Sequence, residues 1–154
     1  SRGNPTVEAE VFLENNISAT AISPSGASTG AFEAHELRDQ DKNKFLGKSV
    51  NIAVENINNR ISSKLKGLDS NDQKNIDKIL LDLDGSENKI NLGANATLAV
   101  SLANSKCSAL TNKRGEPIFS YSGFGRTLSD LRTRTREYCG RNEQLCAADQ
   151  GAKH

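Results

Sequence analysis

The spacing of apolar residues changes once along this chain, and that change constrains the fold more than any other feature. Between residues 6 and 22 apolar residues alternate with polar ones, and the alternation resumes after Asn15-Asn16. This period of two predicts a β-hairpin with one solvent-exposed face. From about residue 49 the period becomes helical, with an apolar stripe opposite polar residues. The stripe comprises Val50, Ala53, Val54, Ile57 and Ile61.

Two further helices are expected after the first. The second has Asp69 or Ser70 as its candidate N-cap and ends before Gly85. Its stripe comprises Ile76, Ile79, Leu80 and Leu83. The third spans about residues 94–111 and should be the buried one, because alanines beside its stripe let a neighbouring backbone approach. That stripe comprises Ala94, Leu98, Ser101, Leu102 and Ser105. A hairpin followed by helices indicates the α+β class.

Length and charge exclude several classes of protein. A chain of 154 residues suits one domain with a core and a tail. The formal net charge is +1, so no global field marks the chain as a binder of nucleic acid or membrane. Net charge does not identify its partners, but we expect neither of these two. The chain has no run of about 20 apolar residues and no basic-then-apolar start, so we expect a cytoplasmic location. Cys107, Cys139 and Cys146 are odd in number and lack zinc-ligand spacing, so we interpret them as isolated thiols.

The stretch PSGASTG, residues 24–30, follows the predicted hairpin and is the first candidate site. Two glycines free its backbone, and Ser25, Ser28 and Thr29 supply hydroxyl groups. Such a loop can close over an anion or offer hard oxygen ligands to a divalent cation. A Gly- and Ser-rich stretch is also a common plain connection. From the residues alone, both interpretations stay open.

Three other polar features favour ordinary explanations. Residues 36–49 mix both charge signs, which is typical of a solvated helix end and loop. His35 has no second ligand at suitable spacing, so we interpret it as a surface or packing residue. The RTRTR stretch, residues 132–136, could contact phosphates, but Asp130 and Glu137 flank it. We interpret it as a solvated or disordered face.

Three motifs, in a fixed order, carry a resemblance to a known family. They are SRGNPTVE at residues 1–8, PSGASTG at residues 24–30 and LDGSENKINLGANATLAVSLA at residues 83–103. Together they resemble the N-terminal domain of enolase, the phosphopyruvate hydratase of glycolysis, a magnesium-dependent lyase. The resemblance runs continuously over about residues 1–122.

The resemblance implies an antiparallel β-meander followed by a helical bundle, which in the family packs on a larger C-terminal barrel. We find no barrel motif in this sequence, and the family's first strand lies mostly upstream of Ser1. We therefore expect a fragment whose sheet lacks part of an edge. Residues 1–122 form the expected domain. Residues 123–154, where isoleucine is absent and arginine outnumbers lysine, form a divergent tail for which disorder is one expectation.

The resemblance also implies roles within the loop. In the family this loop closes over the substrate, and the serine matching Ser28 supplies oxygens to the second of two Mg²⁺ ions. Other loop residues lie against the substrate or let the loop open and shut. The substrate-loop residues implied here are Ser25, Gly26, Ala27, Ser28, Thr29 and Gly30.

In the family a lysine abstracts the proton α to the carboxylate of 2-phosphoglycerate, and a glutamate assists the loss of hydroxide. These residues and the first metal site belong to the barrel, so we expect no catalytic residue in this chain and no activity from it alone. Glu8 matches a position that pairs with the other subunit's barrel, so the family's homodimer is not expected here. The alternative functions are a non-catalytic protein-binding remnant and, third, nucleic-acid binding by the tail.

Overall fold

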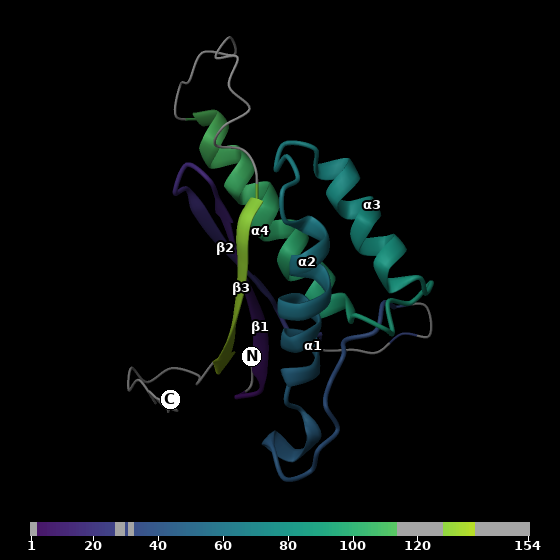
Figure 1. Ribbon diagram of the computed structural model, residues 1–154. Helices are drawn as coiled ribbons and strands as arrows, with labels where there is room; N and C mark the ends of the chain where they lie inside the picture. Colours follow the sequence, from purple (N-terminus) through teal and green to yellow (C-terminus); the bar gives the residue numbers. More distant parts are fainter. Residues whose placement is uncertain (1–2, 27–29, 31–32, 114–127, 138–154) are drawn as a thin grey trace.

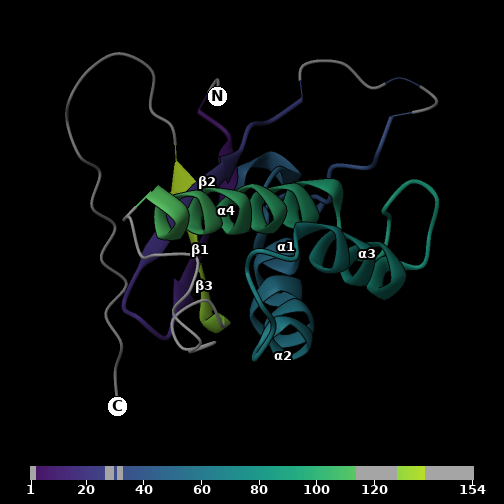
Figure 2. The same ribbon diagram turned by 90° about the horizontal axis from the view of Figure 1, so that it is seen from above.

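The computed structural model describes residues 3–26, 30, 33–113 and 128–137. Helices cover one face of a small sheet, as Figures 1 and 2 show from two directions. The elements are β1 (Pro5–Leu13), β2 (Ser18–Ser23), η1 (Phe45–Gly47), α1 (Asn51–Glu55), η2 (Asn56–Ile61), α2 (Ser62–Leu65), α3 (Gln73–Asp84), α4 (Ala94–Lys113) and β3 (Leu128–Glu137). Within these ranges no helix combines the length and apolar character that a membrane crossing requires.

The strands β1 and β2 form the hairpin that the alternation predicts. They pair antiparallel along the whole of β2. At the turn Asn16 has a left-handed φ of 62°, a conformation that asparagine tolerates better than most residues. The side-chain oxygen of Asn15 accepts a hydrogen bond from the Ile17 amide at 3.1 Å. The predicted hairpin is therefore confirmed.

The strand β3 pairs antiparallel with the other edge of β1, which gives the strand order β2-β1-β3. Two 3.0 Å backbone hydrogen bonds fasten its first residue, one from the Gly67 amide to the Leu128 carbonyl and one from the Leu128 amide to the Leu68 carbonyl. One expectation is thereby corrected, because the edge of β1 is covered. The covering strand, residues 128–137, belongs to the predicted tail. The alternation of threonine and arginine, which we interpreted as a solvated or disordered face, also fits a strand.

The first predicted helix is a continuous helical stretch over residues 51–65, formed by α1, η2 and α2. Its predicted stripe faces the core, since Ala53, Ile57 and Ile61 are fully buried. The middle segment η2 is π-helical. There the side-chain amide of the buried Asn56 donates to two carbonyl oxygens just before α4. The helix is confirmed, and this polar side chain ties it to the next layer.

The second predicted helix is α3, but its N-cap differs from both candidates. The Asp72 carboxylate accepts a hydrogen bond from the Asn75 amide at 3.2 Å. Neither Asp69 nor Ser70 stands at that position, because a capping oxygen must reach an amide two or three residues into the helix. Gly85 ends the helix with a left-handed φ of 68°, as predicted.

The third predicted helix, α4, is buried through a different face from the one expected. The predicted line faces outward, with Leu98 45% and Leu102 40% exposed. A line of small residues faces inward instead, which lets the helix lie close to β1 and β2. Both lines fit a period of 3.6, and the sheet selects the smaller side chains. The buried α4 residues include Ala96, Ala99, Val100, Ala103, Asn104 and Cys107.

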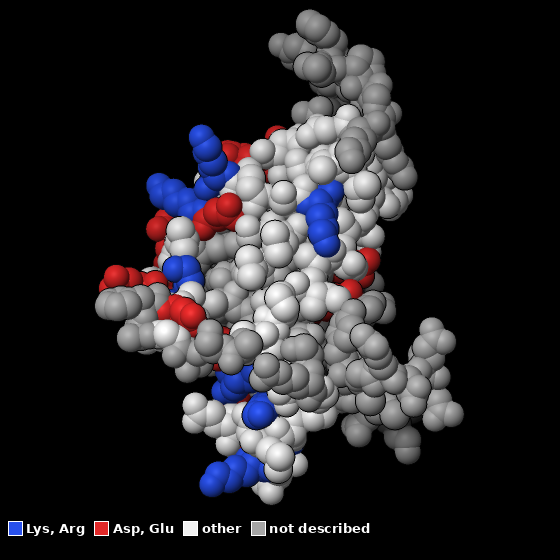
Figure 3. Space-filling model, turned by 180° about the vertical axis from the view of Figure 1, so that it is seen from behind, with Lys and Arg blue, Asp and Glu red and all other residues white. Residues whose placement is uncertain are grey.

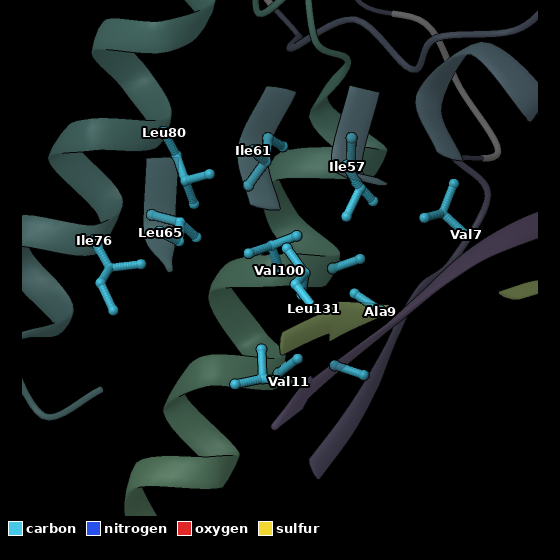
Figure 4. Packing of buried hydrophobic residues seen from close by; sticks show 14 of the residues in the cluster. Val7, Ala9, Val11, Ile57, Ile61, Leu65, Ile76, Leu80, Val100 and Leu131 are labelled. Atoms are coloured by element: carbon cyan, nitrogen blue, oxygen red, sulfur yellow. The ribbon is translucent and has the colours of Figure 1, made fainter. Parts of the chain in front are cut away.

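The core lies between the helices and one face of the sheet. Figure 4 shows side chains from β1, the helix of residues 51–65, α3 and α4 converging there, together with Leu131 of β3. Alternate β1 positions supply one wall of this core, which is what a period of two predicts. The labelled residues are Val7, Ala9, Val11, Ile57, Ile61, Leu65, Ile76, Leu80, Val100 and Leu131.

Cys107 is a free thiol within this core. Its sulfur lies 3.7 Å from the carbonyl oxygen of Val11. Burial raises the pKa of the Cys107 thiol to about 11, so the protonated side chain packs as a small apolar group. The interpretation as an isolated thiol is confirmed for this residue, whereas Cys139 and Cys146 lie outside the described residues.

Candidate functional site

The candidate site is the loop of residues 24–30 together with the connecting segment, residues 33–50, that follows it. The loop leaves the end of β2, where Ser25 is half-buried and its neighbours are exposed. The structure describes part of the predicted set. The described members are Ser25, Gly26 and Gly30, and Ala27, Ser28 and Thr29 lie outside the described residues. The metal-binding role of Ser28 therefore stays a prediction.

Ser25 is held at the start of the loop by an ion pair. Arg38 Nη2 donates to Ser25 Oγ at 3.0 Å and to Glu36 Oε1 at 2.6 Å. The Ser25 hydroxyl in turn donates to Glu36 Oε2 at 3.5 Å. A planar, permanently charged guanidinium can hold a carboxylate and a hydroxyl at once. The Ser25 hydroxyl is thus engaged by the protein's own side chains.

The same guanidinium links the loop to the sheet. Its Nη1 donates to the carbonyl oxygen of Pro5 at 2.8 Å and to that of Lys48. The Arg38 side chain is only 15% exposed. The interpretation of residues 36–49 as a solvated stretch is therefore wrong for Arg38, because a mixture of charges does not reveal which cation has carbonyl groups within reach. It holds for Lys42, which is exposed.

Asn95 fastens the connecting segment to the start of α4. Its Oδ1 accepts from the Leu37 amide at 3.1 Å, and its Nδ2 donates to the Leu37 carbonyl at 3.0 Å. Gly93 permits this approach, because its φ is +95° and a Cβ there would lie 2.6 Å from the Leu37 Cβ. Both residues belong to the motif of residues 83–103. That motif therefore positions the segment that leaves the loop.

His35 takes part in this contact through its backbone. Its amide donates to the Asn88 carbonyl at 2.7 Å, and its carbonyl accepts from the Ala94 amide at 2.8 Å. The His35 residue itself is exposed. The interpretation as a surface residue is confirmed.

Asp39 caps the first helix from a distance. Its carboxylate accepts from the Asn51 and Ile52 amides at 2.9 Å each, and also from the Ser49 hydroxyl. Burial by itself would raise the pKa of Asp39, but these hydrogen bonds outweigh it and lower the pKa below its ordinary value. Ser49, which donates the last of these hydrogen bonds, is buried. An ionised carboxylate thus fixes the far end of the connecting segment.

The described residues do not form a magnesium site by themselves. Mg²⁺ prefers an octahedral shell of oxygens. In the part of the chain that the structure describes, no three His, Cys, Asp or Glu residues group in a way that could hold a metal. The Ser25 hydroxyl is already engaged.

The surface charge gives no support to a nucleic-acid site on the face shown in Figure 3. Basic and acidic side chains are interspersed there around a wide uncharged area. A phosphate backbone is bound through clustered Lys and Arg, and the described residues of this face show no such continuous cluster.

Sequence reasoning missed Arg38 and Asn95 as positioning residues. A weak signal existed for each. Arg38 is the sole arginine among the lysines of residues 36–49, and arginine is the cation suited to several simultaneous acceptors. Asn95 lies in the motif of residues 83–103. That motif supported the resemblance through its place in the order of the three motifs, and not through the chemistry of any single side chain.

A comparison with protein families agrees with this geometry. A family model described as "Enolase, N-terminal domain" matches residues 1–121. The match spans β1, β2, the loop, the connecting segment and all helices of the described structure, and it ends before β3.

Proposed function

The chain belongs to the enolase N-terminal domain family, and we propose that it supplies the substrate-covering part of a phosphopyruvate hydratase. Residues 1–122 are the proposed domain. The reaction of the parent enzyme would be the dehydration of 2-phosphoglycerate to phosphoenolpyruvate in the cytoplasm. The family uses Mg²⁺ in this chemistry.

The observation that carries the proposal is the fixation of the chain on both sides of the loop. Ser25 is held by Arg38 and Glu36, and Leu37 is fastened to Asn95. A loop with fixed flanks can close over a substrate by moving its centre alone. This arrangement supports a lid more than a plain connection.

The proposed roles fall on the centre of the loop. Ser28 would offer a hydroxyl and a carbonyl oxygen, the hard ligands that Mg²⁺ accepts, and Gly26 and Ala27 would lie against the substrate. The ion would supply positive charge beside the carboxylate of the reacting substrate. The base, the acid and the remaining metal ligands would be those of a barrel domain, so this chain alone would not turn over the substrate.

Turnover of 2-phosphoglycerate in the presence of Mg²⁺ tests the proposal. The purified chain is assayed alone and mixed with the barrel domain of an enolase, with a chelated sample as a blank. We expect no turnover from the chain alone and magnesium-dependent turnover from the mixture. Ser28→Ala should lower turnover of the mixture on the order of tenfold or more, because a metal ligand is lost.

Ser63→Ala is the matched control, since it makes the same change at an exposed position of α2 and should leave turnover unchanged. If Ser28→Ala behaved like this control, the metal-ligand role would be wrong. Turnover by the chain alone would refute the division of roles between the two domains. A folded chain that never activates the barrel domain would refute the lid role.

Exposed leucines favour a second candidate, a non-catalytic protein-binding remnant. Leu81 and Leu98 line a groove between α3 and α4, and both are about half exposed. Large exposed apolar residues in one groove are typical of contact surfaces. Leu98→Asp should abolish recovery of protein partners in a pull-down, whereas Leu110→Asp, further along α4, should not. Recovery of chaperones only, from the unchanged chain, would count against this candidate.

A further inference from the structure

At two positions β3 carries the charge opposite to that of the β1 residue it faces, although β3 lies beyond the residues that match the family. Arginine and threonine alternate over residues 132–136. In the antiparallel register Arg132 is opposite Glu10 and Arg134 is opposite Glu8. Residues directly opposite on antiparallel strands share a face of the sheet. Opposite charges thus occupy facing positions at two consecutive places on one face.

The other face of β3 meets the core. Leu131 is opposite Val11 and is 5% exposed, and Leu128 is 2% exposed. These leucines are three positions apart in the sequence, so a regular strand would place them on opposite faces. The register shifts between Phe12 and Leu13, and this bulge lets both leucines border one gap beside Leu65 of α2. The start of the strand is therefore fixed by apolar burial.

We propose that the edge of β1 is a strand-binding site and that residues 128–137 are its ligand, recognised by backbone pairing and by charges opposite Glu8 and Glu10. Main-chain hydrogen bonds give affinity in strand addition, and alternate side chains give specificity. The core-facing leucines fix the start of the strand, and the arginines disfavour a slip by one residue, which would exchange the two faces. The RTRTR stretch is then a structural strand and not a contact for phosphates.

Disulfide trapping tests the register in the full chain, with Cys107, Cys139 and Cys146 replaced by alanine. One variant carries Glu10→Cys and Arg132→Cys, the proposed facing pair. Its matched control carries Glu10→Cys and Arg136→Cys, which lie on the same face but are separated by about 13 Å along the strand. Because a disulfide requires Cα atoms within about 7 Å, the facing pair should oxidise on the order of tenfold more completely. Equal oxidation of both pairs would overturn the proposal.

Hydrogen exchange of the β1 amides tests the charge match without altering β1. Arg132→Glu combined with Arg134→Glu places like charges opposite Glu10 and Glu8, and should lower amide protection roughly tenfold. Arg132→Lys combined with Arg134→Lys keeps the charge and should preserve protection. Equal protection in the two variants would overturn recognition by charge.

Discussion

At the scale of single residues, buried polar side chains do the positioning in this protein. Arg38 joins the start of β1, the loop and the connecting segment, and Asp84 closes the turn that precedes α4. Asp84 accepts from the Leu92 amide at 2.7 Å, from the Ser86 amide at 3.1 Å and from the Ser86 hydroxyl. Hydrogen bonds to charged groups stabilise more than neutral ones. We therefore expect each of these residues to contribute measurably to the free energy of unfolding.

Replacing Arg38 by lysine should destabilise the fold by about 1–3 kcal/mol, because an ammonium group cannot span the same set of acceptors. The midpoint of urea unfolding measures this. Arg60→Lys is the control, since Arg60 is exposed and its two hydrogen bonds are 3.4 Å long. If both variants shifted the midpoint equally, Arg38 would be a surface residue in solution.

Asp84 should make stability depend on pH in the acid range. Burial by itself would raise the pKa of Asp84, but hydrogen bonds from Ser86 and Leu92 outweigh it and lower the pKa below 3.8. The unfolded state therefore binds a proton first as the pH falls, so this contribution is fully present above pH 3.8 and is lost as the pH falls through the native value.

Asp84→Asn should accordingly cost about 1–3 kcal/mol at neutral pH and progressively less below pH 3.8. Thermal unfolding of both proteins between neutral pH and pH 2 measures the difference. A difference that stays constant down to the lowest pH would mean that the carboxylate's charge is unimportant.

At the scale of elements, the contact between α4 and its neighbours depends on small residues. Alanines let the helix lie close to the sheet, and Gly93 lets the connecting segment lie close to the start of the helix. Protein interiors are close-packed, so neither contact can accommodate a larger side chain without strain.

Ala103→Leu should destabilise the protein by about 1–3 kcal/mol, because Ala103 is fully buried in α4. Ala109→Leu is the control on the same helix, where the alanine is exposed, and should change little. Urea unfolding compares them. If Ala103→Leu left the stability unchanged, the observed buried face of α4 would be contradicted. The face that contains Leu98 and Leu102 would then be favoured as the buried one.

Gly93→Ala should cost about 1–3 kcal/mol more than Gly67→Ala. Both glycines have a left-handed φ, +95° and +86°, but only Gly93 has atoms within 4 Å of an added Cβ. The pair therefore separates the steric effect from backbone strain. Equal losses in thermal unfolding would show that Leu37 does not lie against Gly93.

At the scale of the whole molecule, β3 closes the core from the far end of the sequence. Leu131→Ala should destabilise the fold by about 2–5 kcal/mol, as expected for a buried leucine. Leu110→Ala, at a position 45% exposed, should change stability by about 0.5 kcal/mol or less. Chemical unfolding of the two variants measures this. A neutral Leu131→Ala would mean that β3 is not part of the folded core.

Much of the local structure could be predicted from the sequence. The hairpin, the helix of residues 51–65 and the glycine that ends α3 follow from periodicity and backbone preference, which act over a few neighbouring residues. The order of three sequence motifs was sufficient to identify the family. The site was predicted only as a loop, because the partners of Ser25 come from a stretch whose charges look solvated.

Three features were decided by tertiary structure alone. The α4 sequence offers two lines compatible with a helix, and only the proximity of the sheet selects the alanine line. Arg38 has its role because Pro5, Ser25 and Lys48, distant in sequence, bring their oxygens within its reach. Residues 128–137 form a strand because they pair with the edge of β1. Local periodicity cannot predict a pairing partner that lies so far away in the sequence.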